Sequence, residues 1–180
     1  MTSVSRFARV GVFASTLAIA VIASVASPRE ARADEQLLIK APDDHPDYFF
    51  DAEPHGVLGF GPFRQSALLP GAGFRGTFII VKQGFIPKLN NSVGIGVGAD
   101  FFVASSGGVA VVLPAVMQWN FWLSTHWAVF GEPGVAVGLG NRDFVSPIFA
   151  VGGRYHFNER VALTVRVGYP YASVGVSFYF

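Results

Sequence analysis

SVGIGVGADFFVA, residues 92–104, alternates between two kinds of side chain. One face carries apolar residues such as Val93, Ile95 and Val97, and the other carries mostly glycine together with Asp100. A β-strand places successive side chains on opposite faces, whereas a helix groups them at a spacing of about 3.6 residues. The stretch therefore predicts a strand with one apolar face and one small or polar face.

The same period of two recurs along the chain, and no stretch beyond residue 33 keeps a helical period. Each expected strand is long enough to cross a bilayer at a tilt, for which about 9–11 residues are needed. Segments with turn chemistry, such as Ser105–Gly108 and Asn141–Asp143, separate neighbouring strands. The expected strands number eight, at residues 55–64, 73–82, 92–104, 109–123, 127–140, 147–157, 161–169 and 172–180.

The first 33 residues have the features of a secretory signal peptide. Arg6 and Arg9 precede an uncharged apolar run at residues 10–26, and Ala31-Arg32-Ala33 offers a small-x-small cleavage site. A retained membrane helix is the alternative, but an apolar run of this length is at the short limit for spanning a bilayer. We expect cleavage after Ala33.

Composition excludes several classes of function. Hydrophobic residues make up 51% of the 180 residues and charged residues only 14%, against about 25% charged residues in an average soluble domain. A basic footprint for nucleic acid is missing, and the absence of cysteine excludes disulfides and thiolate metal sites. Residues 34–54 hold seven acids against Lys40, so we expect an acidic leader at 34–54 before a barrel at 55–180.

The chemistry of the two strand faces indicates whether lipid or water surrounds the folded chain. The apolar face is large, aromatic and almost free of charge, whereas the other face carries small residues and a few charged ones. Strands in lipid must close into a barrel because every backbone group has to be paired internally. We therefore predict an all-β fold, an eight-stranded antiparallel transmembrane β-barrel in up-and-down meander order, with a soluble periplasmic ligand-binding barrel as the alternative.

The chain ends in ASVGVSFYF, residues 172–180. This ending resembles the C-terminal signal of bacterial outer-membrane proteins, with apolar residues at alternate positions before a terminal phenylalanine. The resemblance implies a signal made by Val174, Val176, Phe178 and Phe180, delivery by the barrel-assembly machinery, and a place among the small eight-stranded outer-membrane barrels such as OmpX and the OmpA membrane domain. It also implies that Phe180 lies at the periplasmic rim, with short outer connections at 65–72, 105–108, 141–143 and near Pro170. The acidic leader would then lie in the periplasm or fold back as a plug.

Two groups of side chains follow from this topology. An aromatic girdle is expected near the periplasmic strand ends, formed by Trp119, Phe121, Trp127, Tyr155 and Phe157. Polar residues on the inward face form a candidate lumen cluster: Arg75, Asp100, Gln118, Asn120, Glu132, Arg154, His156 and Arg166. Within it, Glu132, Arg154 and Arg166 are expected to form an Arg-Glu-Arg cluster. It would either close a packed interior, since buried charges persist only when paired, or form a charged constriction.

Catalysis and metal binding are not expected. A lipid-directed enzyme with a Ser/His/acid site remains an alternative, but His126 and His156 fall near the periplasmic rim and His55 starts the first expected strand. His45 and the neighbouring leader acids could hold a divalent cation, although a solvated acidic segment is favoured. We expect a structural or membrane-integrity barrel or a narrow pore, not an enzyme, with no cofactor. Its expected partners are outer-membrane lipid and the assembly machinery, not nucleic acid.

Overall fold

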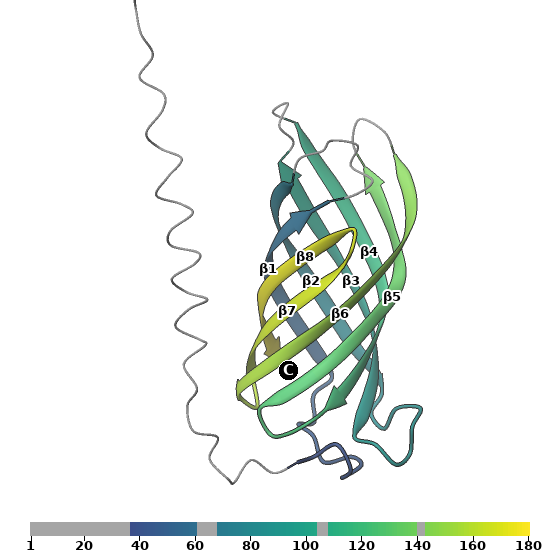
Figure 1. Cartoon of the computed structure of the whole chain (residues 1–180), viewed down its shortest axis with the longest axis vertical. Helices are drawn as coiled ribbons and strands as arrows, with labels where there is room; N and C mark the ends of the chain where they lie inside the picture. The colour runs from purple at the N-terminus through teal and green to yellow at the C-terminus, as the bar shows by residue number, and fades with distance from the viewer. Residues whose placement is uncertain (1–36, 61–67, 104–107, 140–142) are drawn as a thin grey trace, which may run out of the picture. The chain divides into compact units, whose positions relative to one another are not determined.

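Eight antiparallel strands close into a barrel in the computed structural model, which describes residues 37–60, 68–103, 108–139 and 143–180 (Figure 1). Each strand pairs with the next along the chain, and β1 pairs with β8 to complete the circle. The prediction of an eight-stranded meander barrel is confirmed. The strands are β1 (Phe50–Gly59), β2 (Leu69–Val81), β3 (Asn91–Val103), β4 (Val109–Trp122), β5 (Trp127–Leu139), β6 (Phe144–Asn158), β7 (Val161–Tyr169) and β8 (Tyr171–Tyr179).

Strand bounds agree with the alternation for most of the chain, but the first strand differs. β1 begins at Phe50 and ends at Gly59, whereas the sequence predicts residues 55–64. Asp51 and Glu53 therefore belong to the barrel and not to an acidic leader. They lie on the buried face of β1, where Arg154 and Arg166 pair with them inside the barrel.

The connections at the two barrel ends are described to different extents. At the end that holds Phe180, which we call the C-terminal end, residues 82–90, 123–126 and 159–160 join neighbouring strands. At the opposite end, the expected short loops at 105–108 and 141–143 fall mostly outside the described residues. The expected loop at 65–72 also lies partly outside them, and its last four residues are the start of β2. The expected signal peptide lies outside the described residues as well.

The barrel carries its apolar side chains outward and its charges inward. On β3, the outward Phe101 is 51% exposed, whereas the inward Asp100 is fully buried. Outward phenylalanine, valine and isoleucine side chains are exposed on the other strands too, including Phe74, Ile80 and Phe149. This polarity is the reverse of a water-soluble barrel and fits lipid, so the fold is that of a transmembrane barrel. In the part of the chain that the structure describes, no helix has the length and apolar character needed to cross a membrane.

Three layers of side chains fill the interior. An apolar cluster occupies the end opposite the C-terminal end and includes Val57, Phe102 and Ile148. Charged and amide side chains occupy the middle. A second cluster, which contains Tyr48, Trp122, Tyr179, Ile79, Ala128 and Ala162, closes the C-terminal end. The interior is thus a packed core whose middle layer is polar.

Candidate functional site

The inward positions of the strands bring the whole expected lumen cluster inside the barrel. Each of its eight residues is at most 2% exposed. The structure adds Asp51, Glu53 and His55 from β1 and Tyr171 from β8 to the same interior. The sequence signal for the three β1 residues was their alternation with Ala52 and Pro54. The many acidic residues in this region concealed that alternation.

Glu132 on β5 is the centre of the polar layer. Its carboxylate accepts hydrogen bonds from Arg75 Nη1 at 3.1 Å and from Arg166 Nε at 2.6 Å. Gln118 Nε2 donates a further bond at 2.6 Å. Arg166 in turn donates two bonds to the Glu53 carboxylate, at 2.7 and 3.0 Å. Charge-assisted hydrogen bonds are the stronger ones in proteins, and these bonds tie five strands (β1, β2, β4, β5 and β7) together across the lumen.

The expected Arg-Glu-Arg cluster exists, but Arg75 takes the place of Arg154 beside Glu132 and Arg166. Arg154 does not contact Glu132; its guanidinium donates to Asp51 at 2.7 Å, to Asn120 at 3.0 Å and to the Gln118 side-chain oxygen at 3.1 Å. The strand register explains the difference, because Ala150 is the residue opposite Glu132 on β6 and Arg154 lies four positions further toward the C-terminal end. Counting residues from strand ends ignores the stagger that barrel closure imposes.

A histidine and a carboxylate form a second pair in the middle layer. His55 Nε2 lies 2.7 Å from Asp100 Oδ1, and His55 Nδ1 lies 3.2 Å from the backbone oxygen of Glu53. Arg75 reaches toward the same region, with Nη2 3.8 Å from Asp100 Oδ2 and 2.7 Å from the Tyr171 hydroxyl. Four buried carboxylates thus face three buried guanidinium groups and His55 in the described interior. Opposite charges are therefore nearly balanced, as burial demands.

His156 belongs to a different layer from the other expected lumen residues. Its ring stacks on Tyr179 at 5.3 Å between centroids and packs against Trp122 at 4.9 Å. Tyr48 completes the group, at 4.5 Å from Tyr179 and 6.3 Å from Trp122. We call Tyr48, Trp122, His156 and Tyr179 the aromatic layer. Burial raises the pKa of Tyr48 above its ordinary value, so its hydroxyl stays neutral.

Residues 37–49 fold across the C-terminal end of the barrel, and we call them the cap. Backbone hydrogen bonds join Leu38 to Leu123 at 3.0 Å and Asn90 to Ile39 at 2.9 Å. The Asn90 side chain also donates to the backbone oxygen of Asp44 at 2.7 Å. The ring of His45 lies flat on Trp122, 5.3 Å away. Residues 37–49 of the expected leader thus lie folded against this end of the barrel.

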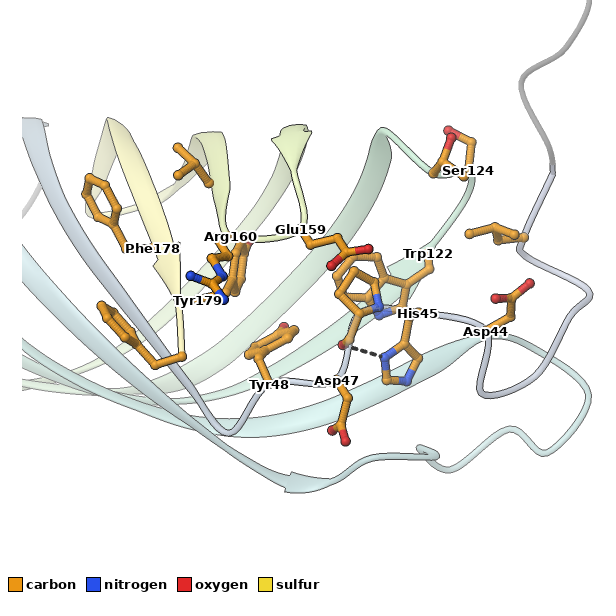
Figure 2. Close-up of a pocket in the computed structure, with 15 residues that line it drawn as sticks. Asp44, His45, Asp47, Tyr48, Trp122, Ser124, Glu159, Arg160, Phe178 and Tyr179 are labelled. Carbon is orange, nitrogen blue, oxygen red and sulfur yellow. Dashed lines mark hydrogen bonds between the residues drawn. The ribbon is translucent and has the colours of Figure 1, made fainter.

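A cavity of about 1070 Å³ lies beside the cap (Figure 2). Tyr48, Trp122 and Tyr179 of the aromatic layer line it, together with Phe178 and Phe180 at the end of the chain. Its polar lining comes from the cap and from two turns: Asp44, His45, Asp47, Ser124, Thr125, Glu159 and Arg160. No group of three or more His, Cys, Asp or Glu side chains arranged to hold a metal ion occurs among the described residues.

The expected girdle residues lie at the C-terminal end, whereas the signal residues run along β8 and end at Phe180. Ring contacts of 5.0–5.4 Å join Trp119 to Phe121, Trp127 to Tyr155 and Tyr155 to Phe157. The signal residues alternate along β8, where Val174, Phe178 and Phe180 are 55%, 40% and 72% exposed, and Val176 is partly exposed.

No family model and no curated protein matches the chain. Similar solved structures include Neisserial surface protein A, which is 13% identical and has a TM-score of 0.49, with 74% of this chain and 97% of that chain covered. The outer membrane protein Ail of Yersinia pestis is 9% identical with a TM-score of 0.45, covering 72% of this chain and 99% of that chain. The N-terminal β-barrel domain of Pseudomonas aeruginosa OprF is 16% identical with a TM-score of 0.42, covering 72% and 97%. At these identities the likeness concerns the fold alone.

Proposed function

We propose that this chain is a sealed structural barrel of the bacterial outer membrane, which supports membrane integrity and does not conduct solutes. The observation that carries the proposal is the filling of the interior by three successive layers of side chains: apolar, ionic and aromatic. The interior of an eight-stranded barrel is just wide enough for side chains to fill. A solute would have to displace residues from all three layers.

The ionic layer resists such displacement most strongly. Glu132 holds two guanidinium groups, and Arg166 is shared between Glu132 and Glu53. Moving either arginine aside would break more than one buried ion pair, and leaving one buried charge without its partner costs about 3–5 kcal/mol. A narrow pore, the other function expected from the sequence, is therefore disfavoured.

Placement in the outer membrane is part of the proposal. The signal-peptide pattern of residues 1–33 supports export, and the alternating C-terminal pattern supports delivery by the barrel-assembly machinery. Val174, Phe178 and Phe180 point outward, where such a receptor and later the lipid can contact them. The proposed partners are accordingly that machinery and outer-membrane lipid, not nucleic acid.

We further propose that the barrel is not an enzyme. His55 is the histidine bonded to a carboxylate in the middle layer, and each of its ring nitrogens already faces an oxygen of Asp100 or Glu53. A general base must have a nitrogen free to reach the hydroxyl that it activates. This pair therefore acts in packing and not in nucleophilic catalysis.

Two measurements test the proposal. Fractionation followed by gel electrophoresis of unboiled and boiled samples should place the chain in the outer membrane with a heat-dependent mobility. The purified mature chain in a planar bilayer should then show no steady current steps, while a general porin in the same bilayer serves as the positive control. Steady open-channel steps would refute the sealed barrel. Recovery in the soluble periplasmic fraction, without a mobility shift, would refute the membrane location.

A further inference from the structure

Residues 82–90, which join β2 to β3 at the C-terminal end, fold against the outer wall of the barrel (Figure 1). Asn91 has the same parity on β3 as the outward Ile95, so its side chain is on the face that elsewhere meets lipid. That side chain holds the loop, because its amide nitrogen donates to the backbone oxygens of Ile86 at 2.9 Å and Leu89 at 2.7 Å. We call residues 82–90 the wall loop.

The wall loop extends the aromatic girdle away from the strands. Trp119 donates its indole N–H to Asn91 Oδ1 at 2.9 Å, and the ring of Phe85 meets the Trp119 ring edge to face, with 5.6 Å between centroids. Trp119 in turn contacts Phe121 at 5.0 Å. Phe85 nevertheless stays 60% exposed, so it presents a large part of its ring outward. The apolar surface of the loop is therefore continuous with the lipid-facing wall.

The charges of the wall loop indicate what it meets. The loop contains two lysines and no acidic residue, whereas the neighbouring cap contains three aspartates and one lysine. Lys82 is held by Asp47 of the cap at 2.6 Å, but the exposed Lys88 forms no ion pair with another described residue. Lys88 follows directly on the apolar run Phe85-Ile86-Pro87. Aromatic rings favour the membrane–water interface, and lysines there keep their charge among the headgroups.

We propose that the wall loop docks on the phospholipid headgroup region of the leaflet at the C-terminal end of the barrel. Phe85 and Ile86 enter the upper part of the acyl chains, and Lys88 reaches the lipid phosphates. The acidic cap, which lies across the lumen at the same end, stays in water. This docking rests on the membrane location proposed above and does not depend on whether the barrel conducts.

Spin-label accessibility in vesicles tests the docking. The chain contains no cysteine, so one introduced cysteine carries one nitroxide label. The mature chain is inserted in vesicles of phosphatidylcholine and phosphatidylglycerol, and the label's collisions with lipid-soluble oxygen are compared with those with a water-soluble nickel chelate. Phe85→Cys is the test position, and Phe149→Cys, at an outward position that is 56% exposed, is the lipid reference. Asp44→Cys is the matched control in the cap, because Asp44 is exposed and contacts Asn90 only through its backbone oxygen.

We expect the oxygen-to-nickel collision ratio at Phe85 to lie above that at Asp44 and below that at Phe149. A ratio equal to that at Asp44, while the Phe149 label reports lipid, would overturn the docking and leave the membrane location intact. A ratio equal to that at Phe149 would overturn the headgroup position. A Phe149 label in water would refute the membrane location itself. Pro87→Cys repeats the measurement if a label at Phe85 disturbs the contact with Trp119.

The charge of Lys88 is tested by Lys88→Gln, with Lys40→Gln in the cap as the matched control, because both lysines are exposed at the same end. One lysine near an anionic membrane surface contributes about 1 kcal/mol, which is about fivefold in an equilibrium constant. Adding phosphatidylglycerol to phosphatidylcholine vesicles should therefore stabilise Lys88→Gln about fivefold less than Lys40→Gln, measured as the equilibrium constant of unfolding in denaturant. Equal stabilisation of the two variants would overturn the contact of Lys88 with lipid phosphates.

Discussion

Removing the carboxylate of Glu132 should destabilise the barrel far more than removing that of Asp47. The two residues form ion pairs with the same shortest distance, 2.6 Å, to Arg166 and Lys82 respectively. Their surroundings differ: the Arg166–Glu132 side chains are at most 1% exposed, whereas those of Lys82 and Asp47 are 63% and 75% exposed. The comparison therefore sets a buried carboxylate with two guanidinium partners against an exposed carboxylate with one ammonium partner.

The expected magnitudes follow from what each variant leaves behind. Glu132→Ala deprives Arg75 and Arg166 of a shared partner, and breaking a buried pair in this way costs about 3–5 kcal/mol. Arg166 keeps its two bonds to Glu53, and Arg75 keeps the Tyr171 hydroxyl. We therefore expect the lower end, about 3 kcal/mol. Asp47→Ala removes an exposed pair, for which about 0–1 kcal/mol is typical.

Equilibrium unfolding in denaturant, with the chain inserted in lipid vesicles, measures both free energies. Tryptophan fluorescence reports the transition, and gel mobility before and after boiling confirms that each variant forms a closed barrel. Should Glu132→Ala fail to fold, Glu132→Gln keeps the shape while removing the charge, and we expect a smaller loss in the same direction. Equal free energies of unfolding for the Glu132 and Asp47 variants would refute the role that we assign to the ionic layer.

Three further predictions concern packing, assembly and processing. Gly73→Ala should destabilise the barrel by about 1–3 kcal/mol, as overpacking does, because a Cβ there would collide with Asp100 and His55. Gly131→Ala, whose Cβ would meet no atom within 4 Å, should stay within about 0.5 kcal/mol in the same unfolding assay. Phe180→Ala should lower the amount of barrel in the outer membrane of cells and leave its stability after refolding in detergent almost unchanged; a normal cellular level would contradict the signal role. The intact mass of the protein purified from membranes should correspond to a chain that begins at Asp34, and a mass that includes residues 1–33 would contradict cleavage after Ala33.

The fold could be predicted almost completely, because alternation is a local property. β7 has the bounds expected from sequence, and β8 begins one residue earlier than expected. The inward or outward direction of a side chain follows from its parity within a strand, so the sequence alone assigns both Asp100 and Arg166 to the interior. The error at β1 arose because Asp51 and Glu53 were grouped by charge with the leader.

The partners within the site could not be predicted in the same way. Which inward residues meet depends on the register between strands and on the stagger around the barrel, neither of which is visible within one strand. Parity places both Arg154 and Glu132 inside, but only the register shows that Arg75 contacts Glu132 and that Arg154 contacts Asp51. The contribution of the cap was equally hidden, because Tyr48 comes before the first strand.

The glycines link the strand pattern to the contacts within the site, because they leave room for the arginines on the inner face. A Cβ on Gly96 or Gly98 would lie 3.3 Å from the side chain of Arg75, which crosses the inner face of β3 at this point. Arg75 can reach Glu132 on β5 because β3 presents no side chain there. The run GIGVG on β3 thus has two functions. Its large residues meet the lipid, and its glycines provide the space in which a chain with few charges concentrates a paired ionic layer at the centre of a membrane barrel.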